Sequence, residues 1–193
     1  MALAARPQTI DEAVLTERVR RGDRTAFGEL VERYMRRAYH VALGLVGSPE
    51  DALDLSQDAF VRAFAARRRL EAGRPFYPWY YQILRRLCFN FLRDRKLHRE
   101  KLRGETPWLV AAAAYREDRE RPDRAAERAA LRRRLQAAVE TLPEHEREVF
   151  VLRELEGLRY REIAELAEIP QGTVMSRLYS ARRRLAHELE DER

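Results

Sequence analysis

Apolar residues recur every three or four positions along almost the whole chain, and this spacing limits the possible folds more than any other feature. The clearest apolar stripe runs from Phe27 to Leu45 and extends over several helical turns. No segment alternates apolar and polar residues convincingly, as a half-buried strand would. Ala, Leu, Arg and Glu dominate the composition, and all four favour helix. The sequence therefore predicts an all-α fold.

Residues that start and stop helices divide this pattern into segments. The clearest boundary is Gly47-Ser48-Pro49, in which the glycine ends one helix, the serine caps the next and the proline suits its first turn. Thr141 and Pro143 mark a similar restart. We predict helices over residues 11–20, 23–46, 48–70, 78–102, 124–140, 143–157, 160–167 and 171–190.

The composition changes between residues 103 and 124. Gly104, Pro107 and mixed charged residues interrupt the helical pattern there, which predicts a linker. We therefore expect two small helical domains, over residues 1–102 and 125–193, joined by a linker over residues 103–124.

The charge balance favours a polyanionic partner, because a formal net charge of +6 suits nucleic acid or an anionic membrane surface. The single cysteine, Cys88, lies in an apolar helical run, so we expect a small buried residue rather than a reactive thiol. The four histidines are scattered without metal-binding spacing, and neither a Ser/His/Asp set nor a glycine-rich phosphate loop is visible. We expect no enzymatic activity, no metal and no cofactor.

The sequence offers no signal for a membrane location. Residues 1–10 lack the apolar core of a secretory signal. No run approaches the roughly 18 apolar residues that a spanning helix needs. We expect a cytoplasmic protein without membrane insertion.

The second half carries the sharpest functional pattern. A short helix, a tight turn at Pro170-Gln171-Gly172 and a longer helix form the arrangement of a helix-turn-helix motif. The residues with the spacing to fill its core are Ile163, Val174 and Leu178. Residues 171–187 contain four arginines and no acid, which suits a groove lined by phosphates. The pattern predicts DNA binding.

The first half carries two further patterns. The helix expected over residues 48–70 begins with acids and has no basic residue before Arg62, so it is either a solvated acidic face or a docking surface for a basic helix. Five aromatic residues crowd between Phe76 and Tyr81, and residues 81–103 hold eight basic and two acidic residues. Unpaired bases stack on aromatic rings, and neighbouring basic residues bind their phosphates. Some of the rings must belong to the core, and Trp79 is the first that we expect there.

Two functions would each explain only some of these sequence patterns. A free-standing regulator with a LuxR-type helix-turn-helix would bind DNA on its own, although the strands of a receiver domain are not visible. A basic helical adaptor at a membrane surface would bind anionic lipid without sequence preference.

Both halves resemble the extracytoplasmic-function family of RNA polymerase sigma factors. Thr141-Leu142-Pro143-Glu144, Arg147-Glu148-Val149-Phe150 and Gly172-Thr173-Val174-Met175-Ser176-Arg177 resemble region 4, which in the family recognises the minus-thirty-five promoter element. Residues 51–60 resemble region 2.2, and residues 76–93 resemble regions 2.3 and 2.4, which melt and recognise the minus-ten element. The resemblance implies an alternative sigma factor. Its partners would be core RNA polymerase (beta-prime clamp helices and beta flap), promoter DNA and an anti-sigma factor.

The resemblance also implies three sets of contact residues. Polymerase would be bound by Asp51, Asp54, Gln57, Asp58 and Phe60. The minus-ten element would be contacted by Arg74, Phe76, Tyr77, Trp79, Tyr80, Arg85, Arg86, Asn90 and Arg93, with a flipped base held by the loop of residues 70–75. The minus-thirty-five element would be contacted by Arg159, Thr173, Ser176, Arg177, Tyr179, Arg182 and Arg183.

Three positions depart from the usual pattern of the family. Arg86 stands where asparagine is usual, and Met175 and Ser180 stand where a basic residue is often found. Because arginine recognises guanine in the major groove, the loss of two basic residues predicts a changed or weaker minus-thirty-five preference.

Overall fold

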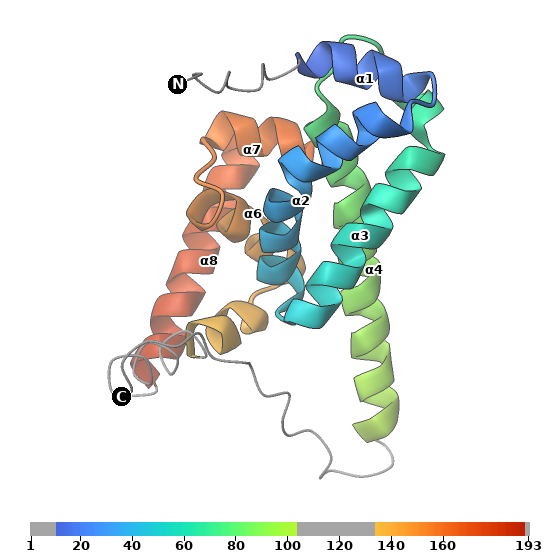
Figure 1. Cartoon of the computed structure of the whole chain (residues 1–193). Helices are drawn as coiled ribbons and strands as arrows, with labels where there is room; N and C mark the ends of the chain where they lie inside the picture. Colours follow the sequence, from blue (N-terminus) through green and yellow to red (C-terminus); the bar gives the residue numbers. More distant parts are fainter. Residues whose placement is uncertain (1–10, 104–133, 192–193) are drawn as a thin grey trace, which may run out of the picture.

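The computed structural model describes residues 11–103 and 134–191, and every regular element within these ranges is a helix (Figure 1). This confirms the all-α prediction. The first half contains α1 (Glu12–Arg20), α2 (Arg24–Val46), α3 (Pro49–Ala65), the short 3₁₀ helix η1 (Arg67–Arg69) and α4 (Phe76–Arg103). The second half contains a helical segment over residues 134–141, followed by α6 (Glu144–Glu154), α7 (Tyr160–Ala167) and α8 (Gln171–Asp191).

The helix boundaries follow local capping chemistry. Gly47 ends α2 in the left-handed conformation with φ +81°, and the Ser48 side chain then accepts a hydrogen bond from the Asp51 N–H at 3.3 Å. Pro49 occupies the first turn of α3, where its missing N–H costs no helical hydrogen bond. The predicted turn at Gly47-Ser48-Pro49 is confirmed.

Two boundaries in the first half differ from the prediction. Helix α3 ends at Ala65 instead of residue 70, and η1 follows it. Helix α4 begins at Phe76, two residues before the predicted start, because proline at position 78 is tolerated within a first helical turn. The Phe76 N–H is satisfied by a distant side chain, since it donates to Glu12 Oε1 at 2.8 Å.

Helices α2, α3 and α4 enclose the core of the first half. Its largest fully buried side chains include Leu30, Leu45, Phe76, Tyr80 and Tyr81. Cys88 is also completely buried, which confirms the expectation for this residue. Residues 104–124 of the predicted linker lie outside the described residues, and Arg103 is the last residue of α4.

The second half has the helix-turn-helix arrangement. Ile163 on α7 and Val174 and Leu178 on α8 are buried, as their spacing predicted. Farther along α8, Ala181 and Leu185 pack against the helical segment of residues 134–141. One side of α8 is therefore buried along most of its length, and the opposite side faces outward.

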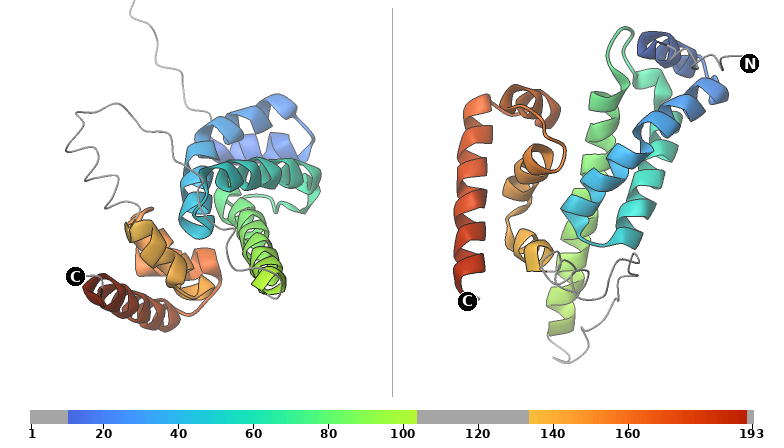
Figure 2. Two further views of the ribbon diagram at one scale, coloured as in Figure 1. Left: turned by 90° about the horizontal axis from the view of Figure 1, so that it is seen from below. Right: turned by 60° about the vertical axis from the view of Figure 1, so that its left-hand side comes forward.

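The two halves pack directly against each other (Figure 2), with α6 beside α2 and α7 beside α4. Gly44 of α2 makes the first of these approaches possible. A Cβ atom at this position would lie 2.8 Å from the methyl groups of Val151 on α6, closer than real contacts allow. Val149 and Leu152 of α6 accordingly belong to the same buried cluster as the core of the first half.

Candidate nucleic-acid interface

The outward side of α8 presents polar, aromatic and basic side chains. Met175 and Tyr179 are 53% and 68% exposed, and Ser176 and Arg183 are exposed beside them. Arg177 is half-buried, as is Thr173, whose carbonyl accepts a hydrogen bond from the Ser176 hydroxyl at 3.1 Å. The predicted contact residues of this helix therefore lie on an accessible surface.

Two predicted phosphate contacts flank this surface. Arg159, at the start of α7, is exposed, and its N–H donates to Glu162 at 2.6 Å. Arg182 is exposed but already engaged, because it donates to Glu154 of α6 at 2.7 Å. A phosphate at Arg182 would therefore have to compete with a carboxylate.

The acidic surface of α3 is accessible, with one exception among its predicted contacts. Asp54 and Gln57 are exposed, Asp51 is half-buried, and Asp58 forms an ion pair with Arg62 on its own helix at 3.0 Å. Phe60 is only 4% exposed and stacks on Tyr80 with ring centroids 4.2 Å apart. The Phe60 ring therefore lies in the core in this arrangement, and its contact with polymerase stays a prediction.

The aromatic cluster of α4 lies mainly inside the molecule. Phe76, Tyr77 and Tyr80 are buried, so they are not accessible to DNA bases in this arrangement, and their contact with the minus-ten element stays a prediction. Burial raises the pKa of the Tyr77 and Tyr80 hydroxyls above their usual value. Trp79, the first ring expected in the core, is instead half-buried, and Tyr81 is completely buried. Trp79 is the ring of this cluster that remains partly accessible.

The polar residues of α4 that were assigned to the minus-ten element divide into two groups. Arg86, Asn90 and Arg93 are exposed and therefore accessible. Arg74, in the loop before α4, is also exposed and forms an ion pair with Glu71 at 2.6 Å. Arg85 instead points toward the second half of the chain and is not available to DNA in this arrangement.

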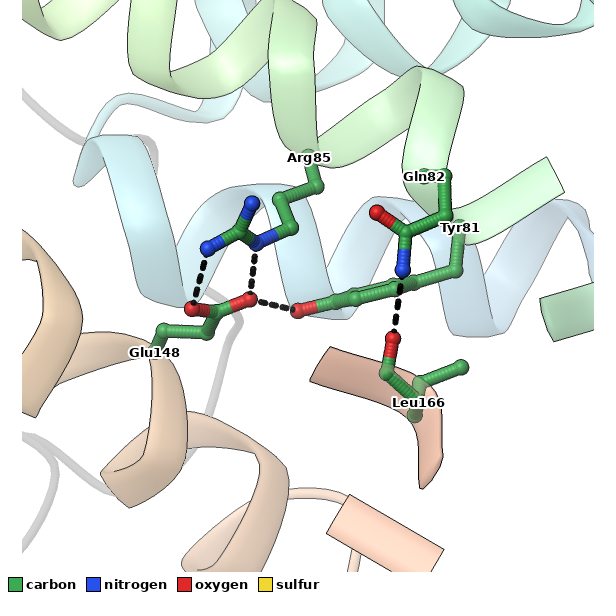
Figure 3. Close-up of polar contacts among 5 residues, drawn as sticks. All are labelled: Tyr81, Gln82, Arg85, Glu148 and Leu166. Atoms are coloured by element: carbon green, nitrogen blue, oxygen red, sulfur yellow. Dashed lines mark hydrogen bonds and ion pairs between the residues drawn. The ribbon is translucent and has the colours of Figure 1, made fainter. Parts of the chain in front are cut away.

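Arg85 is held by Glu148 of α6 (Figure 3). The Glu148 carboxylate accepts hydrogen bonds from Arg85 Nε at 2.5 Å and Nη2 at 3.1 Å, and from the Tyr81 hydroxyl at 2.7 Å. Burial, together with this carboxylate, raises the pKa of Tyr81 well above its usual value, so Tyr81 stays protonated and donates. Burial alone would lower the pKa of Arg85, but the hydrogen bond and charge of Glu148 raise it.

Three further polar contacts join the halves, and the sequence patterns did not indicate them. Gln82 donates to the Leu166 carbonyl at 2.7 Å (Figure 3). Arg37 of α2 pairs with Glu156 at 2.6 Å. Arg147 of α6 donates to the Leu45 carbonyl at 2.7 Å, at the end of α2. The buried carboxylate, the amide and these two guanidinium groups make the contact between the halves specific.

Glu12 of α1 is another residue that sequence patterns missed. Its carboxylate accepts hydrogen bonds from the Phe76 N–H and from the Tyr34 hydroxyl, and Arg33 lies 3.7 Å away. Glu12 therefore fixes the start of α4 and the end of the loop that precedes it. Phe76 lies 64 positions from Glu12 along the chain, which explains why no local sequence pattern indicated this contact.

Comparisons with known proteins agree with this arrangement. Residues 30–98 match the model of Sigma-70 region 2, and residues 132–185 match that of Sigma-70, region 4. The chain is 34% identical over 170 residues to the RNA polymerase sigma-H factor of Pseudomonas aeruginosa, with 87% of this chain and 88% of that protein covered. The chain is also 33% identical to the ECF RNA polymerase sigma-E factor of Escherichia coli, with 91% and 92% of the two chains covered. The chain belongs to the extracytoplasmic-function family of RNA polymerase sigma factors.

Solved structures show the same fold. The structure of CnrH in complex with the cytosolic domain of CnrY is similar to this sigma factor with a TM-score of 0.67 and 25% identity, and the match covers 94% of this chain and 99% of that one. The sigma factor RpoE of Bartonella quintana, solved with the anti-sigma factor NepR, gives a TM-score of 0.64 at 23% identity, over 86% and 98% of the two chains. The fold class is therefore confirmed.

The described part of this sigma factor contains no group of three or more side chains that could hold a metal ion. Within residues 11–103 and 134–191, no helix is both long and apolar enough to cross a membrane. Sigma factors are known as non-enzymatic transcription initiation factors.

Proposed function

We propose that this sigma factor directs RNA polymerase to specific promoters through three surfaces, each carried by one helix of the described chain. Membership of the family supports the overall activity. The assignment of surfaces rests on the exposure and charge of particular side chains.

The first surface is the acidic side of α3, which we assign to core polymerase. Asp54 and Gln57 are exposed, and the helix has no basic residue before Arg62. Leu53 is exposed next to Asp54, so the surface combines charge with an apolar contact. A surface of this kind fits a basic helix, because complementary charge guides association and fixes orientation.

The second surface is the outward side of α8, which we assign to the minus-thirty-five element. Ser176 and Arg177 lie in its first turns, where a recognition helix contacts base edges. Arg159 and Arg183 lie at the border of the surface and suit phosphate contacts, which position the protein without specifying sequence.

The third surface is the exposed side of α4 with the preceding loop, which we assign to the opened minus-ten element. Arg86, Asn90 and Arg93 are exposed along the helix, and Trp79 is partly accessible near its start. Phe76 and Tyr80 are completely buried in the core, so they do not form part of this exposed surface.

The contact between the halves supports a regulated activity. The Glu148 carboxylate accepts two hydrogen bonds from the Arg85 guanidinium, as a phosphate would. In the packed arrangement, Arg85 is therefore not available to DNA. CnrH was solved with CnrY, and RpoE with the anti-sigma factor NepR. An anti-sigma factor as a further partner of this chain is in keeping with those complexes.

The observation that carries the proposal is the order of regions 2 and 4 on one chain, with an exposed acidic surface on α3. Its test is a pull-down of purified core polymerase with wild type and with Asp54→Arg/Asp58→Arg. The control is Glu32→Arg/Glu165→Arg, two exposed acids outside the three surfaces whose reversal changes net charge equally. We expect binding by wild type and the control, and loss of binding by the α3 variant. Absence of binding by folded wild type, free of any inhibitor, would overturn the proposal.

A further inference from the structure

The exposed side of α8 carries two large side chains, Met175 and Tyr179, at its centre. Met175 and Tyr179 lie four positions apart and therefore share one side of the helix. Both are more than half exposed, whereas Leu178 between them is buried in the core. A large apolar side chain left in water on a binding helix indicates that its partner offers an apolar group.

These two side chains line a shallow hollow of about 490 Å³ together with Tyr160, Leu178, Arg182 and Arg183. Tyr160 comes from the start of α7, next to Arg159. The hollow therefore lies between the two helices of the helix-turn-helix motif, with an apolar floor and arginines at its rim.

The arginine rim decides which apolar group fits. An apolar protein segment would form no ion pair with the exposed Arg183, whereas duplex DNA brings phosphates to it, and also to Arg182 in competition with Glu154. Within the major groove, the C5-methyl of thymine is the apolar group that a base pair displays. Met175 lies in the second turn of α8, close to its N-terminus. In a recognition helix, the N-terminal residues contact base edges.

We propose that Met175 and Tyr179 recognise the C5-methyl groups of thymines in the promoter element bound by α8. This inference rests on the proposed function of α8 and adds a base preference to it. Where an arginine at position 175 would select guanine through two hydrogen bonds, methionine selects thymine through apolar contact and rejects the polar edge of cytosine. Tyr179 extends the same contact by one helical turn toward the phosphates at Arg182 and Arg183.

The test uses the full chain assembled with core polymerase. Preferred upstream sequences are first selected from a random duplex library. Each thymine of the selected element is then replaced by deoxyuridine, which removes only the methyl group. We expect at least one replacement to weaken binding by about fourfold, the effect of exposing one buried methyl group. Met175→Ala should bind thymine and deoxyuridine equally at that position, and Met175→Arg should prefer guanine there.

Leu135→Ala is the matched control, because Leu135 is also an exposed apolar residue but lies outside α8 and the hollow. It should retain the preference of wild type for thymine. Sequence-specific binding by wild type without any penalty from deoxyuridine would overturn the inference and leave the proposed function intact. Absence of sequence-specific binding by the assembled wild type would overturn both.

Discussion

The carboxylate of Glu148 forms a bidentate ion pair with the guanidinium of Arg85, and the two residues belong to different halves of the chain. Glu148 is completely buried, whereas the Arg85 side chain is 25% exposed. A fully buried carboxylate is costly unless it is paired and hydrogen-bonded, and here Arg85 and Tyr81 provide both requirements. If the halves were to separate, Glu148 would return to water and Arg85 would become available to a phosphate.

Glu148→Gln should therefore shift the chain toward a separated arrangement. The amide keeps a hydrogen-bonding oxygen for Tyr81 but loses the charge that holds Arg85. Because a hydrogen bond to a charged group contributes about 1.5–3 kcal/mol, the separated population should rise by roughly tenfold or more. Small-angle scattering of the free chain should show a larger radius of gyration.

The matched control for this change is Glu165→Gln. Glu165 lies on α7 and pairs, within the described part of the chain, with Arg161 of the same helix at the surface. Its loss should leave the radius of gyration unchanged. If Glu148→Gln were as compact as wild type in solution, the ion pair would not be what holds the halves together.

Trp79→Ala should weaken binding of single-stranded minus-ten DNA by the assembled polymerase. Trp79 is the partly accessible ring of the aromatic cluster, and one stacked base contributes about 1–3 kcal/mol. That range corresponds to a loss of roughly fivefold to more than a hundredfold. The measurement is a titration with a labelled oligonucleotide.

Trp79→Phe separates stacking from folding, because it keeps an aromatic face at the same position. It should retain most of the affinity that Trp79→Ala loses. Equal losses in the two variants would show that Trp79 acts through the fold and not through a stacked base.

Glu12→Ala should destabilise the first half by removing a cap from α4. Loss of a side-chain cap costs about 0.5–2 kcal/mol, and the Tyr34 hydroxyl loses its acceptor as well. The variant should unfold at a lower urea concentration and support less promoter opening. The control is Glu17→Ala, since Glu17 pairs with Arg20 of α1 and with Arg21, which directly follows that helix. Similar losses from both changes would contradict the role of Glu12 in positioning α4.

The parts of the fold that were predictable from sequence are those governed by neighbouring residues. Gly47 and Ser48 act within one turn, and Ile163, Val174 and Leu178 follow the 3.6-residue period of a single motif. Both the boundary and the helix-turn-helix core were therefore predicted correctly. The accessible residues of α8 followed from the same period.

The side of α4 that faces the core was not predictable in this way. Aromatic residues occupy five of the six positions from Phe76 to Tyr81, so the local pattern gives no preferred side. The start of the helix is set by Glu12, which is distant in sequence. Glu148 was missed for the same reason, because its partners lie in the other half of the chain. Gly44 within α2 was the available signal for a close helix contact.

Cys88 should be inert toward thiol reagents in the folded protein. Burial raises the pKa of this thiol to about 12, and only the thiolate reacts. At pH 8 the folded chain should therefore react only after urea is added, whereas Cys88→Ala should give no labelling. The unfolded thiol ionises near pH 8.5, so between that pH and about 12 the unfolded chain binds fewer protons than the folded one. The stability that wild type holds relative to Cys88→Ala should consequently decrease as the pH rises through this window, which urea titrations at pH 8 and pH 10 would measure. Rapid labelling at pH 8 without urea would contradict the burial of Cys88 that the packing of α4 requires.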